Sequence, residues 1–187
     1  MQRVIRYHPI LVILHWLLAA LIIAALCIGF LSLAATPNTD PGKIPVLRLH
    51  MAGGMLILAL TVLRAVTRKF TARPAPISTG HRLADSLAPL THYGFYALIL
   101  LMVGTGYATG IIAGLPAIVF ANSGDPLPPN FDAYPTFTAH FYLALALLAL
   151  IVLHIAAALY HHAVRKDGLL RRMAFGKRRM DTSVPAE

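Results

Sequence analysis

The chain has 187 residues, of which 58% are hydrophobic and only 12% are charged, and its mean hydropathy is +0.70. Soluble domains carry about 25% charged residues, so this composition excludes an ordinary water-soluble fold and predicts a protein that lies in a lipid bilayer. The net charge of +9 does not indicate nucleic-acid binding, because the basic residues lie between the apolar stretches instead of forming one basic face.

The first apolar segment covers residues 10–35, enough for a helix that crosses a hydrocarbon core of about 30 Å. Arg3 and Arg6 precede it, as in a signal peptide, but the apolar stretch is far longer than the h-region of a signal. It carries His15 near its start. The single cysteine, Cys27, excludes an internal disulfide, and we interpret it as a small buried apolar side chain.

The second segment covers residues 45–67 and carries His50 near its start. Gly53 and Gly54 follow at offsets that place them on the same helical face as His50. Small residues would let a large flat ligand approach the helix, but they equally let membrane helices pack closely. Both interpretations of these glycines stay open.

The third segment covers residues 89–113. It begins near His92, and Gly104 and Gly106 interrupt its apolar run. Backbone groups in lipid must be hydrogen-bonded within their own segment, so this segment and the other three are expected to be α-helices.

The fourth segment covers residues 136–163 and carries His140 and His154. Their spacing of 14 residues, at about 100° per residue, leaves them about 40° apart on one helical face. The rise of about 1.5 Å per residue separates them by roughly 21 Å, so one lies near each membrane surface.

Basic residues lie almost entirely on one side of this four-helix arrangement. All but two of the 16 lysines and arginines belong to the N-terminal stub, the second-to-third connection with its flanking helix ends, and the tail at 164–187. The other side has only Lys43 and Arg48. By the positive-inside rule, both termini are expected in the cytoplasm. The predicted fold is a single all-α domain over residues 1–187, an integral membrane four-helix bundle.

Four histidines lie inside the predicted helices at two matching depths. Because helix direction alternates, His15 and His154 fall near the inner surface, and His50 and His140 fall near the outer surface. An ionisable residue in a membrane helix is costly and normally has a partner. Two histidines at one depth suit bis-imidazole ligation of a haem iron. The chain has no C-x-x-C-H motif, so such a haem would be bound without covalent attachment.

A histidine-lined metal transporter is the weaker alternative. A structural zinc site brings its four ligands together, whereas these four histidines are split between two depths.

Short motifs surround these histidines and continue into the tail: His15-Trp16, Leu49–Gly54, Leu153–His162 and Lys166–Met173. In order and spacing they resemble the bacterial cytochrome b561 family, and the similarity covers nearly the whole chain. Ala139 stands where the family often has tryptophan just before the outer histidine of the fourth helix. This difference affects the packing around the outer haem and leaves ligation intact.

The resemblance implies two haem b groups, four transmembrane helices and a bacterial inner membrane. It assigns axial ligation to His15, His50, His140 and His154, in agreement with the matched depths. It also implies a superoxide:ubiquinone oxidoreductase, in which superoxide or another small donor is oxidised at the outer face and electrons reach ubiquinone through both haems. No side chain is expected to act as a nucleophile.

Further polar residues near the helix ends are candidates for contacts to haem propionates or to a quinone head group. These candidates are Arg64, His92 and His161 on the inner side and Arg48 on the outer side. Arginine can bind a carboxylate through two parallel hydrogen bonds. The simpler alternative for each is a side chain that anchors a helix end at the membrane interface.

A different function would use the same cofactor and topology. A haem b anchor subunit would relay electrons between a partner dehydrogenase or hydrogenase and the quinone pool, and would not be an enzyme on its own. Tight co-purification with a partner protein, and no turnover in isolation, would favour this alternative.

Overall fold

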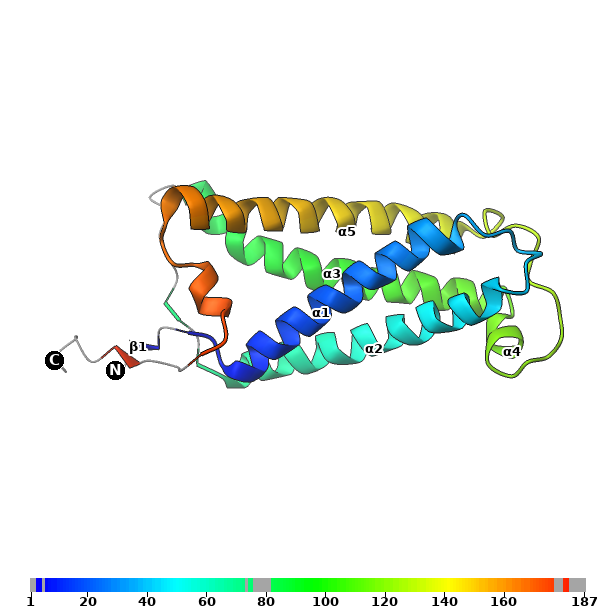
Figure 1. The fold of residues 1–187 in the computed structure, drawn as a ribbon, viewed down its shortest axis with the longest axis horizontal. Coiled ribbons are helices and arrows are strands. Elements are labelled where there is room, and N and C mark those ends of the chain that lie inside the picture. Colours follow the sequence, from blue (N-terminus) through cyan, green and yellow to red (C-terminus); the bar gives the residue numbers. More distant parts are fainter. Residues whose placement is uncertain (1–2, 5, 73, 76–81, 177–179, 182–187) are drawn as a thin grey trace.

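The computed structural model describes residues 3–4, 6–72, 74–75, 82–176 and 180–181. Its main elements are long helices arranged side by side (Figure 1). They are α1 (Pro9–Cys27) with its π-helical continuation η1 (Ile28–Leu33), α2 (Lys43–Phe70), α3 (Arg82–Ile112), and α5 (Pro135–Tyr160) with its continuation η2 (His161–Arg165). Four stretches within them are long and apolar enough to cross a membrane: Pro9–Leu33, Lys43–Phe70, Leu90–Ile112 and Pro135–Arg165.

This arrangement confirms the predicted all-α bundle of four membrane helices. The ends of the apolar stretches differ from the predicted ones by only a few residues. The third helix begins earlier than its apolar stretch, at Arg82, because hydropathy marks the part of a helix that lies in lipid and not its polar first turns.

The described parts of the two terminal segments, the end of α2 and the start of α3 lie at one end of the bundle (Figure 1). Two short strands join the terminal segments there, since β1 (Arg3–Val4) pairs antiparallel with β2 (Met180–Asp181). The sequence did not predict this pair. The short helix α4 (Leu115–Val119) lies at the opposite end. The helices therefore alternate in direction, as the matching of histidine depths assumes.

A layer of apolar side chains fills the middle of the bundle. Leu18, Ile57, Ile99 and Leu147 come from α1, α2, α3 and α5 respectively, and they form one buried cluster. Leu147 lies midway between the two histidines of α5 in the sequence. The layer therefore separates two levels of the bundle, each of which holds histidines.

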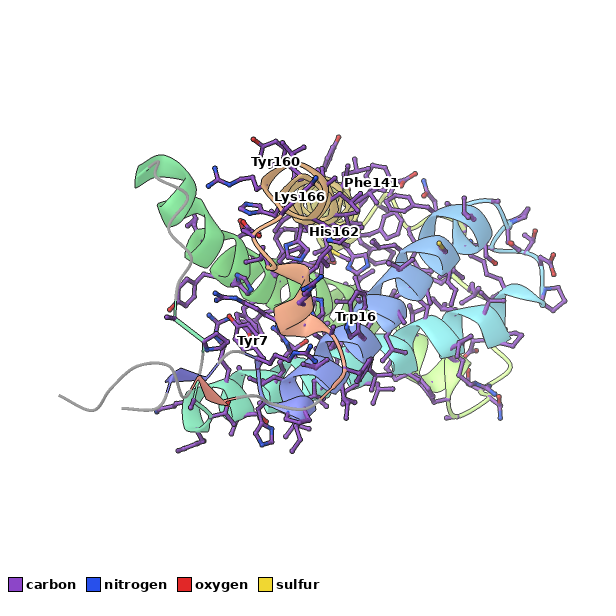
Figure 2. All side chains as sticks on the ribbon, turned by 60° about the vertical axis from the view of Figure 1, so that its left-hand side comes forward. Tyr7, Trp16, Phe141, Tyr160, His162 and Lys166 are labelled. Atoms are coloured by element: carbon purple, nitrogen blue, oxygen red, sulfur yellow. The ribbon has the colours of Figure 1, made fainter. Side chains whose placement is uncertain are left out.

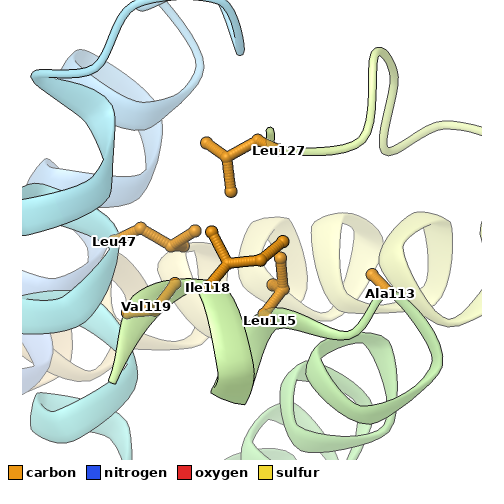
Figure 3. Close-up of a cluster of buried hydrophobic side chains, with 6 residues drawn as sticks. All are labelled: Leu47, Ala113, Leu115, Ile118, Val119 and Leu127. Carbon is orange, nitrogen blue, oxygen red and sulfur yellow. The ribbon is translucent and has the colours of Figure 1, made fainter. Parts of the chain in front are cut away.

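A second apolar cluster closes the α4 end of the bundle, where α4 packs against α2 (Figure 3). We call this the outer end and the opposite end the inner end, after the orientation predicted from the sequence. Its buried residues are Leu47, Ala113, Leu115, Ile118, Val119 and Leu127. Gly114 links α3 to α4 with a φ of 67°, a left-handed backbone conformation that glycine adopts without strain. The sharp turn returns the chain over the end of the bundle.

The outward faces of the long helices are apolar and exposed, as expected of surfaces that meet lipid. Cys27 lies on such a surface, so the prediction that its side chain is buried is wrong. In a membrane protein, a residue within an apolar segment can face either the core or the lipid. Hydropathy does not separate the two, because both are apolar.

The tail folds back over the inner end of the bundle through the short helix η3 (Leu170–Met173). The indole Nε1 of Trp16 donates a hydrogen bond to the carbonyl of Met173 at 2.9 Å, and the backbone N–H of Tyr7 donates to the carbonyl of Arg172 at 3.3 Å. Figure 2 shows Tyr7 and Trp16 on either side of η3. The tail is therefore part of the folded structure at this end.

Candidate functional site

At the outer level, His50 of α2 and His140 of α5 face each other across the bundle. Their ring centroids are 6.2 Å apart, and the ring planes make an angle of 78°. The two side chains come from helices that run in the same direction, so their equal depth follows from where each falls in its helix.

At the inner level, His15 of α1 and His154 of α5 form the corresponding pair. Their ring centroids are 6.3 Å apart, with an interplanar angle of 66°. The ring of His92 on α3 lies at a similar distance from His154, 6.4 Å between centroids. Distance alone therefore leaves two possible partners for His154 at this level.

The spacing within each pair has a simple chemical meaning. A ligating nitrogen lies about 2 Å from its metal and about 1.1 Å from the centre of its imidazole ring, so two imidazoles on opposite sides of one iron have ring centres about 6.2 Å apart. Both pairs have this separation. The ring separation in each pair is therefore compatible with one iron between the two rings.

The ring of His140 is held by its neighbours on α3. Its Nδ1 donates to the carbonyl of Met102 at 2.9 Å, an arrangement that leaves Nε2 as the available ligand nitrogen. The ring lies directly against Gly106, where an added Cβ would be only 3.0 Å from Cε1 and 3.1 Å from Nδ1. The absence of a side chain at Gly106 therefore leaves the space that this ring occupies.

The ring of His50 lies against α1. A Cβ added to Gly29 would make an ordinary contact with its Cε1, at 3.6 Å. The carbonyl of Ala25 faces the His50 side chain, but no acceptor makes a hydrogen bond of good geometry with Nδ1. The outer pair is therefore oriented more firmly at His140 than at His50.

A cavity of ≈ 1380 Å³ surrounds the outer pair. Small-molecule pockets are typically about 300–1,000 Å³, so there is room for a ligand as large as a porphyrin. His50, His140, Gly29, Gly54 and Gly106 all line it. The cavity extends from the middle layer of the bundle to the outer loops.

The lining of the cavity shows which of the glycines leave space for a ligand and which do not. Gly54 and Gly106 line it, and a Cβ on Gly54 would meet nothing within 4 Å. Gly53 and Gly104 are not among its lining residues. One glycine of each pair therefore shapes the cavity.

A cation lies at the inner level. Arg64 of α2 is close enough to interact electrostatically with both His15 and His154. Its Nη1 donates to the hydroxyl of Tyr96 at 3.0 Å, while its buried Nε has no hydrogen-bond partner. A buried donor without a partner is costly, so Arg64 is suited to bind an acceptor that is not part of the protein.

Arg48 and His161, two other candidates for propionate or quinone contact, bond to other parts of the protein. On the outer side, Arg48 donates from Nε to the carbonyl of Val119 at 2.6 Å and from Nη2 to Oδ1 of Asn122 at 2.8 Å. Beyond the inner pair, Nδ1 of His161 donates to Oδ2 of Asp167 at 2.5 Å. These contacts hold α4 and the start of the tail in place.

Sequence reasoning missed several residues around the sites. The Met102 carbonyl has no signature in the sequence, because any residue type supplies a backbone acceptor. Tyr96, the partner of Arg64, carried no signal either. Gly29 did carry one, since a glycine within an apolar helix indicates close packing at that point.

Side chains alone do not form a metal site in the described part of the chain. No group of three or more His, Cys, Asp or Glu residues there could hold a metal ion. The paired arrangement suits a ligand that brings its own equatorial donors and takes two axial histidines, as haem does. It gives no support to the metal-transporter alternative.

Comparison with known proteins identifies the family of the chain. Residues 6–176 match the family described as prokaryotic cytochrome b561. The chain belongs to the prokaryotic cytochrome b561 family. It is 29% identical over 182 residues to cytochrome b561 homolog 2 of Escherichia coli (strain K12), covering 96% of each chain. It is 31% identical over 184 residues to the probable superoxide oxidase CybB of Yersinia pestis, covering 92% of this chain and 98% of that one.

Membership establishes the general role of this b561-family chain. It is a membrane electron-transfer protein of the bacterial membrane, in a family whose proteins bind haem b. Its own residues fit that cofactor: the histidine pairs have the spacing for axial ligation, Gly106 leaves room for the His140 ring, and Arg64 has an unused donor for a carboxylate.

Proposed function

We propose that the chain binds two haems b and acts as a superoxide:ubiquinone oxidoreductase. The observation that supports it best is the presence of two histidine pairs at two depths, each with the ring separation suited to one iron. The proposed axial ligands are His50 with His140 and His15 with His154. When bound, haem b supplies one-electron redox chemistry, which no side chain of this protein provides.

The electron balance sets the stoichiometry. Oxidation of one superoxide to dioxygen releases one electron, and reduction of ubiquinone to ubiquinol takes two electrons and two protons. Two superoxide ions are therefore consumed for each ubiquinone. The protein contributes fixed ligand positions, an apolar environment that sets the redox potentials, and exclusion of water by the middle layer of the bundle.

The proposed direction of transfer depends on how the two levels of the bundle are oriented in the membrane. We place the α4 end outside the cell membrane and the termini in the cytoplasm, because the basic residues concentrate at the end that carries the termini. Superoxide then reacts at the His50–His140 level, and electrons leave at the His15–His154 level.

At the inner level, Arg64 and His92 are the proposed contacts for propionates or for the quinone head group. Arg64 has the unpartnered Nε, and the ring of His92 lies beside that of His154. His161 is bonded to Asp167, which makes it a weaker candidate for direct contact.

The choice of superoxide rests on a relative. The Yersinia pestis protein, 31% identical to this chain, is named a probable superoxide oxidase. The structure supports a small outer donor in general, because the cavity around His50 and His140 extends to the outer loops.

The test is turnover by the purified protein in detergent. Superoxide generated enzymatically should reduce the haems and then a soluble ubiquinone, and added superoxide dismutase should abolish both reactions. His140→Ala should remove quinone reduction, because the outer site is lost. Absence of haem reduction by superoxide would overturn the proposed donor. Reduction only through a co-purifying dehydrogenase or hydrogenase would instead establish the anchor-subunit function.

A further inference from the structure

Lys43 lies on the same face of α2 as the outer histidine. It is the first residue of the helix, seven positions before His50, so the two side chains differ by about 20° around the axis and about 10 Å along it. The side chain lines the cavity that also contains His50 and His140. Only 6% of the residue is exposed.

Among the described residues, its contacts are a carbonyl and an aromatic ring, and they include no carboxylate. Nζ donates to the carbonyl of Thr36 at 2.5 Å and lies 6.0 Å from the ring centroid of Phe131. The ion pair between His161 and Asp167 is the sole one in the described part of the chain, so no carboxylate is paired with Lys43 there. Lysine is almost never fully buried unless it is paired.

The nearby charged groups do not supply a carboxylate partner. The carboxylate of Asp40, three residues before Lys43, accepts from the N–H of Gly42 and forms no ion pair with Nζ. Asp132 lines the same cavity but is farther than 4.0 Å from Nζ. Arg48, the other cation at this end, bonds to Val119 and Asn122 and does not line the cavity. Among the described lining residues, Lys43 is therefore the one lysine or arginine.

We propose that Lys43 is the counter-ion of the outer haem and donates a charge-assisted hydrogen bond to a propionate carboxylate. This inference rests on the proposed two-haem function, and it assigns to Lys43 a role for which the sequence analysis named Arg48. The propionates carry the negative charge that the buried ammonium lacks, and hydrogen bonds between ionised groups are roughly twice as strong as neutral ones.

The experiment is a redox titration of the purified holoprotein and three variants. Lys43→Gln removes the charge, Lys43→Arg keeps it, and Arg48→Gln removes an equal charge from the same end but outside the cavity. Removal of a nearby cation disfavours the reduced, more negative iron. The midpoint potential of one haem should therefore fall in Lys43→Gln, stay near wild type in Lys43→Arg and fall less in Arg48→Gln.

A pH profile separates this pairing from a purely structural role. Without the ammonium, the propionate should hold its proton to higher pH, so the same haem in Lys43→Gln should acquire a pH-dependent potential near neutrality. Potentials of both haems unchanged in Lys43→Gln would overturn the inference. Loss of the outer haem in both Lys43 variants would also overturn it. Haem binding would then depend on the shape of the lysine side chain and not on its charge.

The haem content of the wild type distinguishes failure of the role of Lys43 from failure of the proposed two-haem function. Two haems b per wild-type chain, together with unchanged potentials in Lys43→Gln, reject the role of Lys43 alone. Fewer than two haems in the wild type reject the proposed function itself.

Discussion

At the scale of single residues, the candidate ligands could be predicted from the sequence, but the residues that hold them in place could not. The depth of each histidine follows from its place in a helix of known direction, so both pairs could be proposed from sequence. The partners of Arg48 could not be predicted, because they belong to the unpredicted helix α4 and the loop after it. Arg64 lies within electrostatic reach of His15 and His154, and the sequence gave no indication of its bond to Tyr96.

Gly106 offers the sharpest test at this scale. In Gly106→Ala the new Cβ would lie 3.0 Å from Cε1 of His140, so the ring must move and its bond to the Met102 carbonyl must weaken. We expect haem content to fall from two toward one per chain, or the outer haem to change its spectrum and potential, measured by pyridine haemochrome and redox titration.

Gly104→Ala is the matched control for this substitution. It lies two positions away on the same helix, and a Cβ there would meet nothing within 4 Å. It should keep both haems. Equal haem loss in the two variants would contradict a specific role for Gly106.

At the scale of elements, hydropathy predicted the long helices because each must present apolar side chains to lipid over about 30 Å. It could not predict α4, which is five residues long and too short for a periodic signal. The strand pair at the termini is shorter still, and it depends on tail contacts that bring distant segments together.

The middle layer should govern how firmly the helices pack. Leu147 is 3% exposed and meets Leu18, Ile57 and Ile99. Leu147→Ala should lower stability by about 2–4 kcal/mol through the cavity it leaves, and thermal unfolding followed by haem absorbance measures this. Leu148→Ala, on the exposed side of the same turn, is the control, and a comparable loss there would argue against a packed middle layer.

The junction between η2 and the tail should loosen in acid. Partial burial by itself raises the pKa of Asp167, but hydrogen bonds from His161 and from the N–H of Leu169 lower it below its ordinary value of 3.8. The stabilisation is therefore present above about pH 4 and is lost as pH falls through the lowered pKa.

Hydrogen exchange of the tail measures this effect. Protection of residues 167–173 should decrease as pH falls below about 4, after correction for intrinsic exchange rates. In Asp167→Asn the protection should be lower at neutral pH and should no longer depend on this titration. Equal protection of the tail in the wild type and in Asp167→Asn at neutral pH would show that the contact between His161 and Asp167 does not hold the tail in place.

At the scale of the whole molecule, the proposed orientation in the membrane rests on the distribution of basic residues and not on packing. Fusion of alkaline phosphatase to the C-terminus should give no activity, while fusion of a fluorescent protein should give fluorescent cells, because we place both termini in the cytoplasm. Fusion within the α4 end should give the reverse pattern. Active phosphatase at the C-terminus would invert the proposed direction of electron transfer.

The central claim is that two histidine pairs hold two haems b at separate levels. The most direct measurement is the number of haems per chain in the purified protein and in His140→Ala, His15→Ala and His92→Ala. We predict two haems in the wild type, one in His140→Ala, one in His15→Ala and two in His92→Ala. A single haem in the wild type, or loss of a haem in His92→Ala but not in His15→Ala, would contradict the assigned pairs.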